Sequence, residues 1–122
     1  MDVADAVGLW KQYMQPMGDQ GYKIISPACT NSPDGFTWIQ QFVSQVEQSG
    51  GWVRSPSVQS THLIDQLLQM DGIATHIYST DLSYATSFLT TFIQTFPGYG
   101  IWVTEYACEV SPFIPSVRMS DG

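Results

Sequence analysis

Apolar and polar positions along the chain follow two alternating patterns. Apolar residues recur at the spacing of an amphipathic helix in three stretches, which run from Val3 to Met17, from Trp38 to Val46 and from Leu82 to Phe96. Short apolar runs that suit buried strands follow each helical stretch, at Tyr22 to Ser26, Gly72 to Tyr78 and Ile101 to Glu105. The pattern therefore predicts three helices and three strands in alternation.

Residues that favour caps and turns mark the ends of these elements. Asp2 is a candidate N-cap of the first helix, and Gly18 to Gly21 follow its last apolar position. Asn31 to Gly35 form a turn and cap cluster, and Pro97 to Gly100 precede the last strand. Strands that alternate with long helices imply crossover connections and a parallel sheet, so the predicted fold class is α/β.

One stretch departs from this alternation. The first two predicted strands start much farther apart in sequence than the last two, and the surplus lies in residues 53–69, which show no clear period. Removal of residues 53–69 would make the two spacings nearly equal. An ordinary surface insertion explains this surplus, and so does a translated intron, because its codons permit splice signals at both ends.

Composition excludes several classes of protein. The chain has 122 residues, a formal charge of −7 and only four Lys plus Arg, so it offers little cationic surface for nucleic acid. No apolar run approaches the roughly 20 residues of a membrane span. The first residues are acidic and amphipathic, unlike a signal peptide, so we expect any secretion signal to lie upstream of Met1. The two cysteines, Cys29 and Cys108, are compatible with a disulfide, a metal site or free thiols.

Candidate catalytic residues gather at the ends of the last two predicted strands. Strict alternation along the last strand places Ile101, Val103 and Glu105 on one face, with Glu105 at the carboxyl end. His76 and Tyr78 share a face at the end of the preceding strand by the same period. Because catalytic groups of parallel barrels collect at this end of the strands, we predict that these three side chains converge.

Four blocks of the sequence resemble, in order, those of a known enzyme family. They are residues 21–28 (GYKIISPA), 33–42 (PDG with WIQQF), 71–78 (DGIATHIY) and 101–108 (IWVTEYAC). The resemblance is to the glycosyl hydrolase catalytic core, a family that includes the fungal endo-β-1,3-glucanases of glycoside hydrolase family 128. It covers most of residues 1–109 and omits residues 53–69 and the tail at 110–122, which is expected to be irregular and to arise from a second translated intron.

The resemblance implies a retaining hydrolase of β-glucan on a (β/α)8 TIM barrel, of which this chain supplies about strands 5 to 7. Glu105 matches the nucleophile of strand 7. His76 and Tyr78 match a His-Trp-Tyr block, with Ile77 in place of its tryptophan. The implied substrate is a β-glucan of cell walls, and the parent protein is expected to be extracellular or in the cell wall. The implied chemistry needs no cofactor and no metal.

The second catalytic carboxyl group is expected to be absent from the chain. Retaining hydrolysis needs two carboxyl groups about 5 to 5.5 Å apart, and the family places the acid/base in an Asn-Glu-Pro block before the helix that begins here at Met1. Asp34, Asp71 and Asp81 fit a turn, a strand start and a helix cap instead. We therefore expect no turnover by this chain alone.

Two other interpretations remain open at this point. The chain could be a non-catalytic fragment that binds carbohydrate or a partner through Tyr78, Tyr106 and the loop at Asn31. It could also be the product of a misread gene that does not fold stably. The enzyme interpretation uses Glu105 as nucleophile and treats His76, Tyr78, Tyr106 and Asn31 as supporting or substrate-binding residues.

Overall fold

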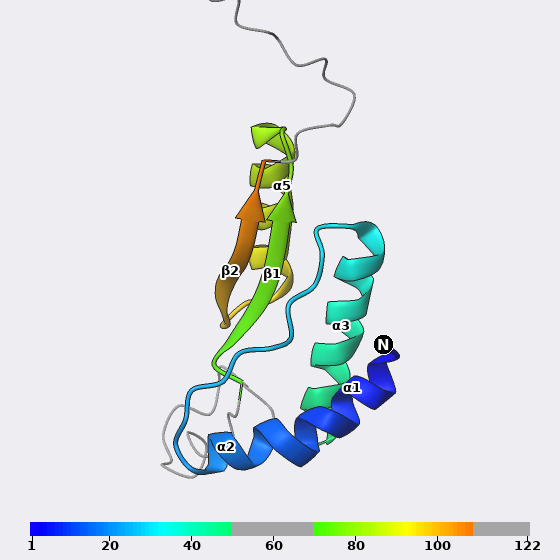
Figure 1. Cartoon of the computed structure of the whole chain (residues 1–122), viewed down its shortest axis with the longest axis vertical. Coiled ribbons are helices and arrows are strands. Elements are labelled where there is room, and N and C mark those ends of the chain that lie inside the picture. The colour runs from blue at the N-terminus through cyan, green and yellow to red at the C-terminus, as the bar shows by residue number, and fades with distance from the viewer. Residues whose placement is uncertain (50–69, 109–122) are drawn as a thin grey trace, which may run out of the picture.

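The computed structural model describes residues 1–49 and 70–108 (Figure 1). The interpretations of residues 53–69 and 110–122 as translated introns fall outside these described residues. Within them, a parallel pair of strands, β1 and β2, lies against helix α5, and α3 packs beside the N-terminal helices. No helix in these two ranges has both the length and the apolar character needed to cross a membrane.

The N-terminal helical region is continuous but changes its winding. It consists of α1 (Val3–Leu9), the π-helical turn η1 (Trp10–Met14) and α2 (Gln15–Asp19). Asp2 caps α1 as predicted, since its carboxylate accepts a hydrogen bond from the Ala4 N–H at 2.8 Å. The Gln15 N–H donates to the Trp10 carbonyl, five residues back. Pro16 lacks an N–H and crowds the preceding turn, so the wider π turn accommodates it without a break.

Helix α3 (Pro33–Ser49) begins at the predicted turn and cap cluster. The Ser32 hydroxyl accepts a hydrogen bond from the Gly35 N–H at 3.0 Å, as an N-cap serine does. The Trp38 ring stacks on Phe42, with centroids 5.4 Å apart, and packs against the core. Amphipathic spacing thus directs one face of α3 inward.

The strands and their connection match the predicted ranges closely. β1 (Gly72–Tyr78) pairs in parallel with β2 (Gly100–Ala107), and α5 (Leu82–Thr95) joins them. Asp81 is the N-cap of α5, and its carboxylate accepts hydrogen bonds from the N–H groups of Ser83 and Tyr84 in the first turn. The turn before β2 uses Gly98 at φ 85°, a conformation that favours glycine.

The strand expected at residues 22–26 is not formed as a regular strand. The segment instead makes two isolated parallel bridges to β1, Ile25 with Gly72 and Cys29 with Thr75. Between them, the Ser26 hydroxyl accepts the hydrogen bond of the Ala74 N–H at 2.9 Å. A side-chain acceptor therefore stands where the ladder would use a main-chain carbonyl, and the ladder is interrupted. The segment still lies along the edge of β1 opposite β2, in chain order.

Strict alternation along β2 is also wrong. Thr75 pairs with Val103, but His76 pairs with Glu105, so the register shifts by one residue between them. Paired residues share a face of the sheet, and the extra residue therefore turns Glu105 away from the face of Val103. Glu105 still lies on the face of His76, as expected, but the reason is a bulge and not an unbroken period.

The hydrophobic core lies on one face of the sheet. Ile73 is fully buried there, and it shares the core with Phe92 of α5, the C-cap residue Phe96 and apolar residues of α3 and α1. The opposite face carries His76, Tyr78 and Glu105. Neither α5 nor α3 covers this face (Figure 1). The site residues therefore project from the sheet on the side away from the core.

Candidate functional site

Three side chains converge at the carboxyl ends of β1 and β2. The Tyr78 hydroxyl donates a hydrogen bond to Oε2 of Glu105, and Nδ1 of His76 lies 3.6 Å from the same oxygen. The rings of His76 and Tyr78 meet edge to face, with centroids 6.2 Å apart. The predicted convergence of Glu105, His76 and Tyr78 is therefore confirmed. The two contacts orient the Glu105 carboxylate, and its side chain is 55% exposed and therefore accessible.

The end of β1 is held in place by Asn31. Its amide nitrogen donates to the Tyr78 carbonyl at 3.1 Å, and its amide oxygen accepts from the Tyr78 N–H at 3.0 Å. The hydroxyl of Tyr84, in the first turn of α5, donates to the Asn31 carbonyl. Both polar groups of the Asn31 side chain are thus used by the main chain of the residue that contacts Glu105. Asn31 is predicted from the sequence as a supporting or substrate-binding residue, and a contact with substrate stays a prediction.

Tyr106 is not brought to this cluster. It pairs with Ile77, which is buried on the core side, so its side chain leaves the opposite face from Glu105. It is 82% exposed. A role for Tyr106 in substrate contact remains a prediction, and it would have to operate at the rim of the sheet.

Trp102 lies on the same face as Glu105, which the sequence analysis missed. It pairs with Ala74, and its indole lies over the strand starts, because a Cβ at Gly72 would come within 2.6 Å of the ring. Strict alternation assigns Trp102 to the other face. No local sequence signal for the bulge at Val103 and Thr104 could have revealed this, since both residues are ordinary in regular strands.

No second carboxylate of the described residues joins Glu105. Asp71 accepts a hydrogen bond from the Ile24 N–H at 2.8 Å, at the start of β1. That position is roughly 15 Å from Glu105 along the strands, given about 3.3 Å per residue. Asp81 caps α5, and Glu47 accepts a hydrogen bond from Tyr99. Asp71, Asp81 and Glu47 are therefore engaged elsewhere.

Both cysteines are free thiols. Cys29 is buried, with its sulfur 3.6 Å from the Thr75 hydroxyl, and Cys108 is exposed. Burial raises the pKa of the Cys29 thiol, and its hydrogen bond to Thr75 only partly offsets this effect. Residues 1–49 and 70–108 contain no group of three or more metal-ligating side chains arranged around a common centre.

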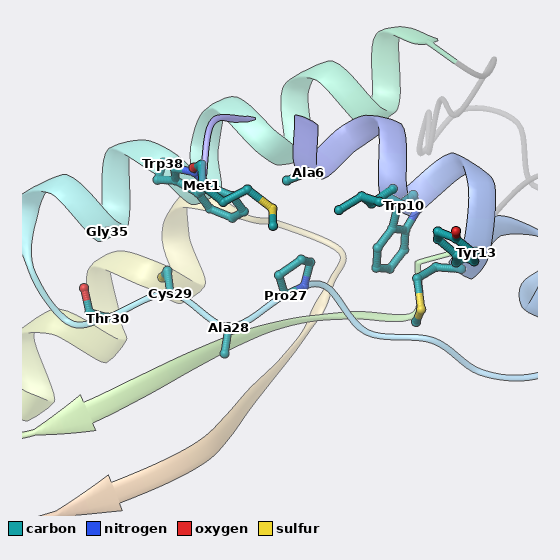
Figure 2. A pocket seen from close by; sticks show the side chains of 12 residues that line it. Met1, Ala6, Trp10, Tyr13, Pro27, Ala28, Cys29, Thr30, Gly35 and Trp38 are labelled. Atoms are coloured by element: carbon teal, nitrogen blue, oxygen red, sulfur yellow. The ribbon is translucent and has the colours of Figure 1, made fainter. Parts of the chain in front are cut away.

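The described residues also form an apolar pocket of about 620 Å³, whose lining does not include Glu105. Figure 2 shows the side chains that line it. The N-terminal helices, the segment after Ile25 and the start of α3 form its walls, which include Trp10, Tyr13, Pro27, Cys29 and Trp38. None of the predicted site residues lines it. Trp10 is 3% exposed, and its indole N–H has no hydrogen-bond partner among residues 1–49 and 70–108.

The fold and site define an α/β protein with a carboxylate presented at the ends of parallel strands. The profile of the family described as "Glycosyl hydrolase catalytic core" matches residues 1–119, and the chain belongs to this family. A search of curated proteins finds no match.

Among solved structures, the fold is similar to that of a glycoside hydrolase family 128 (subgroup VI) exo-β-1,3-glucanase from Aureobasidium namibiae. The TM-score is 0.68 at 18% sequence identity, and the match covers 88% of this chain. The chain spans 36% of the length of that enzyme.

Proposed function

We propose that this chain is part of a retaining glycoside hydrolase that acts on β-glucan, with β-1,3-glucan as its substrate. Glu105 is the nucleophile, and Tyr78 and His76 orient it. The observation that carries the proposal is the shared contact of Tyr78 and His76 with a single oxygen of Glu105. Membership of the glycosyl hydrolase catalytic core family supports the class of reaction.

The geometry suits nucleophilic attack by a carboxylate. Oε2 of Glu105 is engaged by Tyr78 and His76, which leaves Oε1 to attack the anomeric carbon. The bond from that carbon to the leaving oxygen breaks as the ester to Glu105 forms, and an acid must protonate the leaving oxygen. Water then hydrolyses the ester and releases Glu105 with net retention of configuration.

Two features of the fold support a partial barrel of about strands 5 to 7. The bridged segment at Ile25 to Cys29, β1 and β2 are parallel neighbours in chain order. The connecting helix α5 and helix α3 contribute to one core on the same face of these strands. A barrel has strands in chain order with helices only outside, whereas a doubly wound sheet has helices on both faces.

We further propose that the acid/base carboxyl group comes from the part of the barrel that this chain does not supply. Asp71 and Asp81 are committed to main-chain hydrogen bonds, which supports this view. Without protonation of the leaving oxygen, an unactivated glucan is not cleaved at a useful rate.

The test uses laminarin, a β-1,3-glucan, with the purified chain and with a parent protein that carries the whole barrel. We expect the parent to release sugars whose anomeric proton signals, followed by NMR, show retention. We expect the chain alone to release no more sugar than its Glu105→Gln variant. Hydrolysis by the chain alone would contradict an external acid/base, and net inversion by the parent would contradict a nucleophilic Glu105.

A further inference from the structure

The hydrogen bonds between β1 and the segment before α3 change character at the site. His76 donates to the Cys29 carbonyl at 2.8 Å, main chain to main chain. Two residues later, the main chain of Tyr78 bonds to a side chain on this edge. The side-chain amide of Asn31 takes that place with one donor and one acceptor. On the other edge, β2 continues beside β1 to the pair of Tyr78 and Ala107.

We propose that Asn31 is a positioning residue that sets the Tyr78 hydroxyl on Glu105, and not a substrate contact. The inference rests on the proposed function of Glu105 as nucleophile. A carboxamide mimics the peptide group, and Asn presents its donor and acceptor together at this reach. The Asn31 main chain is itself tied to α5 through the Tyr84 hydroxyl. Helix α5, the end of β1 and the carboxylate on β2 are therefore linked through Asn31 and Tyr78.

Position matters here because Tyr78 lies at the last residue of β1. Strand ends fray when their main-chain groups lose partners, and a phenol at the end of a long side chain amplifies a small rotation of its Cα. Loss of the Asn31 amide would leave the Tyr78 N–H and carbonyl without that partner. The Tyr78 ring would then sample positions away from Glu105, whereas the earlier part of β1 keeps its ladder to β2.

The experiment measures the proximity of Tyr78 and Glu105 by NMR in the full 122-residue chain. The readout is the nuclear Overhauser effect between the Tyr78 ring protons and the Glu105 side-chain protons, with Tyr78 assigned through Tyr78→Phe. We expect Asn31→Ala to abolish this signal. Asn31→Asp changes the shape of the side chain least, keeps the acceptor and loses the donor, and we expect it to weaken the signal.

Asp71→Ala is the matched control. It removes a side-chain hydrogen bond of 2.8 Å between the same segment and β1, at the opposite end of the strand. We expect it to destabilise the sheet and to preserve the Tyr78–Glu105 signal. If Asn31→Ala does not fold, the Tyr78–Glu105 signal is compared in Asn31→Asp and in Tyr84→Phe, which removes the hydroxyl that donates to the Asn31 carbonyl.

A Tyr78–Glu105 signal of undiminished strength in folded Asn31 variants would overturn the proposal. Equal loss in Asp71→Ala would also overturn it, because the effect would then be general loosening of the sheet. The measurement uses no substrate, so its outcome is independent of whether Glu105 acts as a nucleophile. A failure of the proposed function would appear only in the laminarin assay.

Discussion

A tyrosine that donates to a strand-end carboxylate restricts the rotamers of that carboxylate. Tyr78 provides this contact to Glu105, and His76 lies beside the same oxygen. The residue types and their strand-end positions were predictable from the sequence. The contact itself depends on which faces the side chains take, and that follows from the register of two strands distant in sequence.

At the same scale, burial separates the two thiols. The pKa of Cys29 is raised by desolvation, so less thiolate forms at a given pH, and its sulfur is enclosed. We expect a disulfide reagent at pH 8 to modify Cys108 quickly and Cys29 only when the chain unfolds. Absorbance measured with and without denaturant gives the two phases.

Cys108→Ser is the control for that experiment, since it should remove the fast phase and keep the slow one. A fast phase that survives in Cys108→Ser would mean that Cys29 is accessible. The enclosed position of the segment against β1 would then be wrong.

At the scale of elements, helices and regular strands were predictable, and irregular ones were not. Cap residues and apolar spacing located α5 and β1 nearly to the residue, whereas α3 extends beyond the predicted Trp38 to Val46 at both ends. The segment at Tyr22 to Ser26 was overestimated, because an apolar run before Pro27 does not reveal that a serine hydroxyl replaces the ladder. The bulge in β2 was also missed, since it arises from pairing with β1 and not from a local signal.

Glycine substitutions test the packing of the sheet. An alanine Cβ at Gly72 would lie 2.6 Å from the Trp102 ring and 2.8 Å from the Gly100 carbonyl oxygen. We expect Gly72→Ala to lower the free energy of unfolding by about 1 to 3 kcal/mol, because overpacking forces the strands to shift. Denaturant titration followed by circular dichroism measures the change.

Gly8→Ala is the opposite case in the same chain. Gly8 is exposed within α1, and nothing lies within 4 Å of a Cβ built there. We expect a gain of about 0.5 to 1 kcal/mol from the lower backbone entropy of the unfolded state. If Gly72→Ala is as stable as Gly8→Ala, the indole of Trp102 does not lie over the start of β1.

At the scale of the whole molecule, the chain carries the proposed nucleophile on a sheet with one uncovered face. One face of β1 and β2 is covered by the core, and the face with Glu105 is open. The similar solved enzyme is longer, and this chain spans 36% of it. In our account the remaining strands close the barrel over the exposed face and bring the acid/base carboxyl group to Glu105.

Covalent trapping of the nucleophile tests the central claim most directly. A 2-deoxy-2-fluoro-β-laminaribiosyl fluoride carries a leaving group that needs little acid assistance, and its fluorine at C2 slows hydrolysis of the ester intermediate. The parent protein with the whole barrel is incubated with this reagent, digested with pepsin and analysed by tandem mass spectrometry. The account predicts one sugar adduct, on Glu105, and none in Glu105→Gln. An adduct on another carboxylate, or equal labelling of Glu105→Gln, would contradict it.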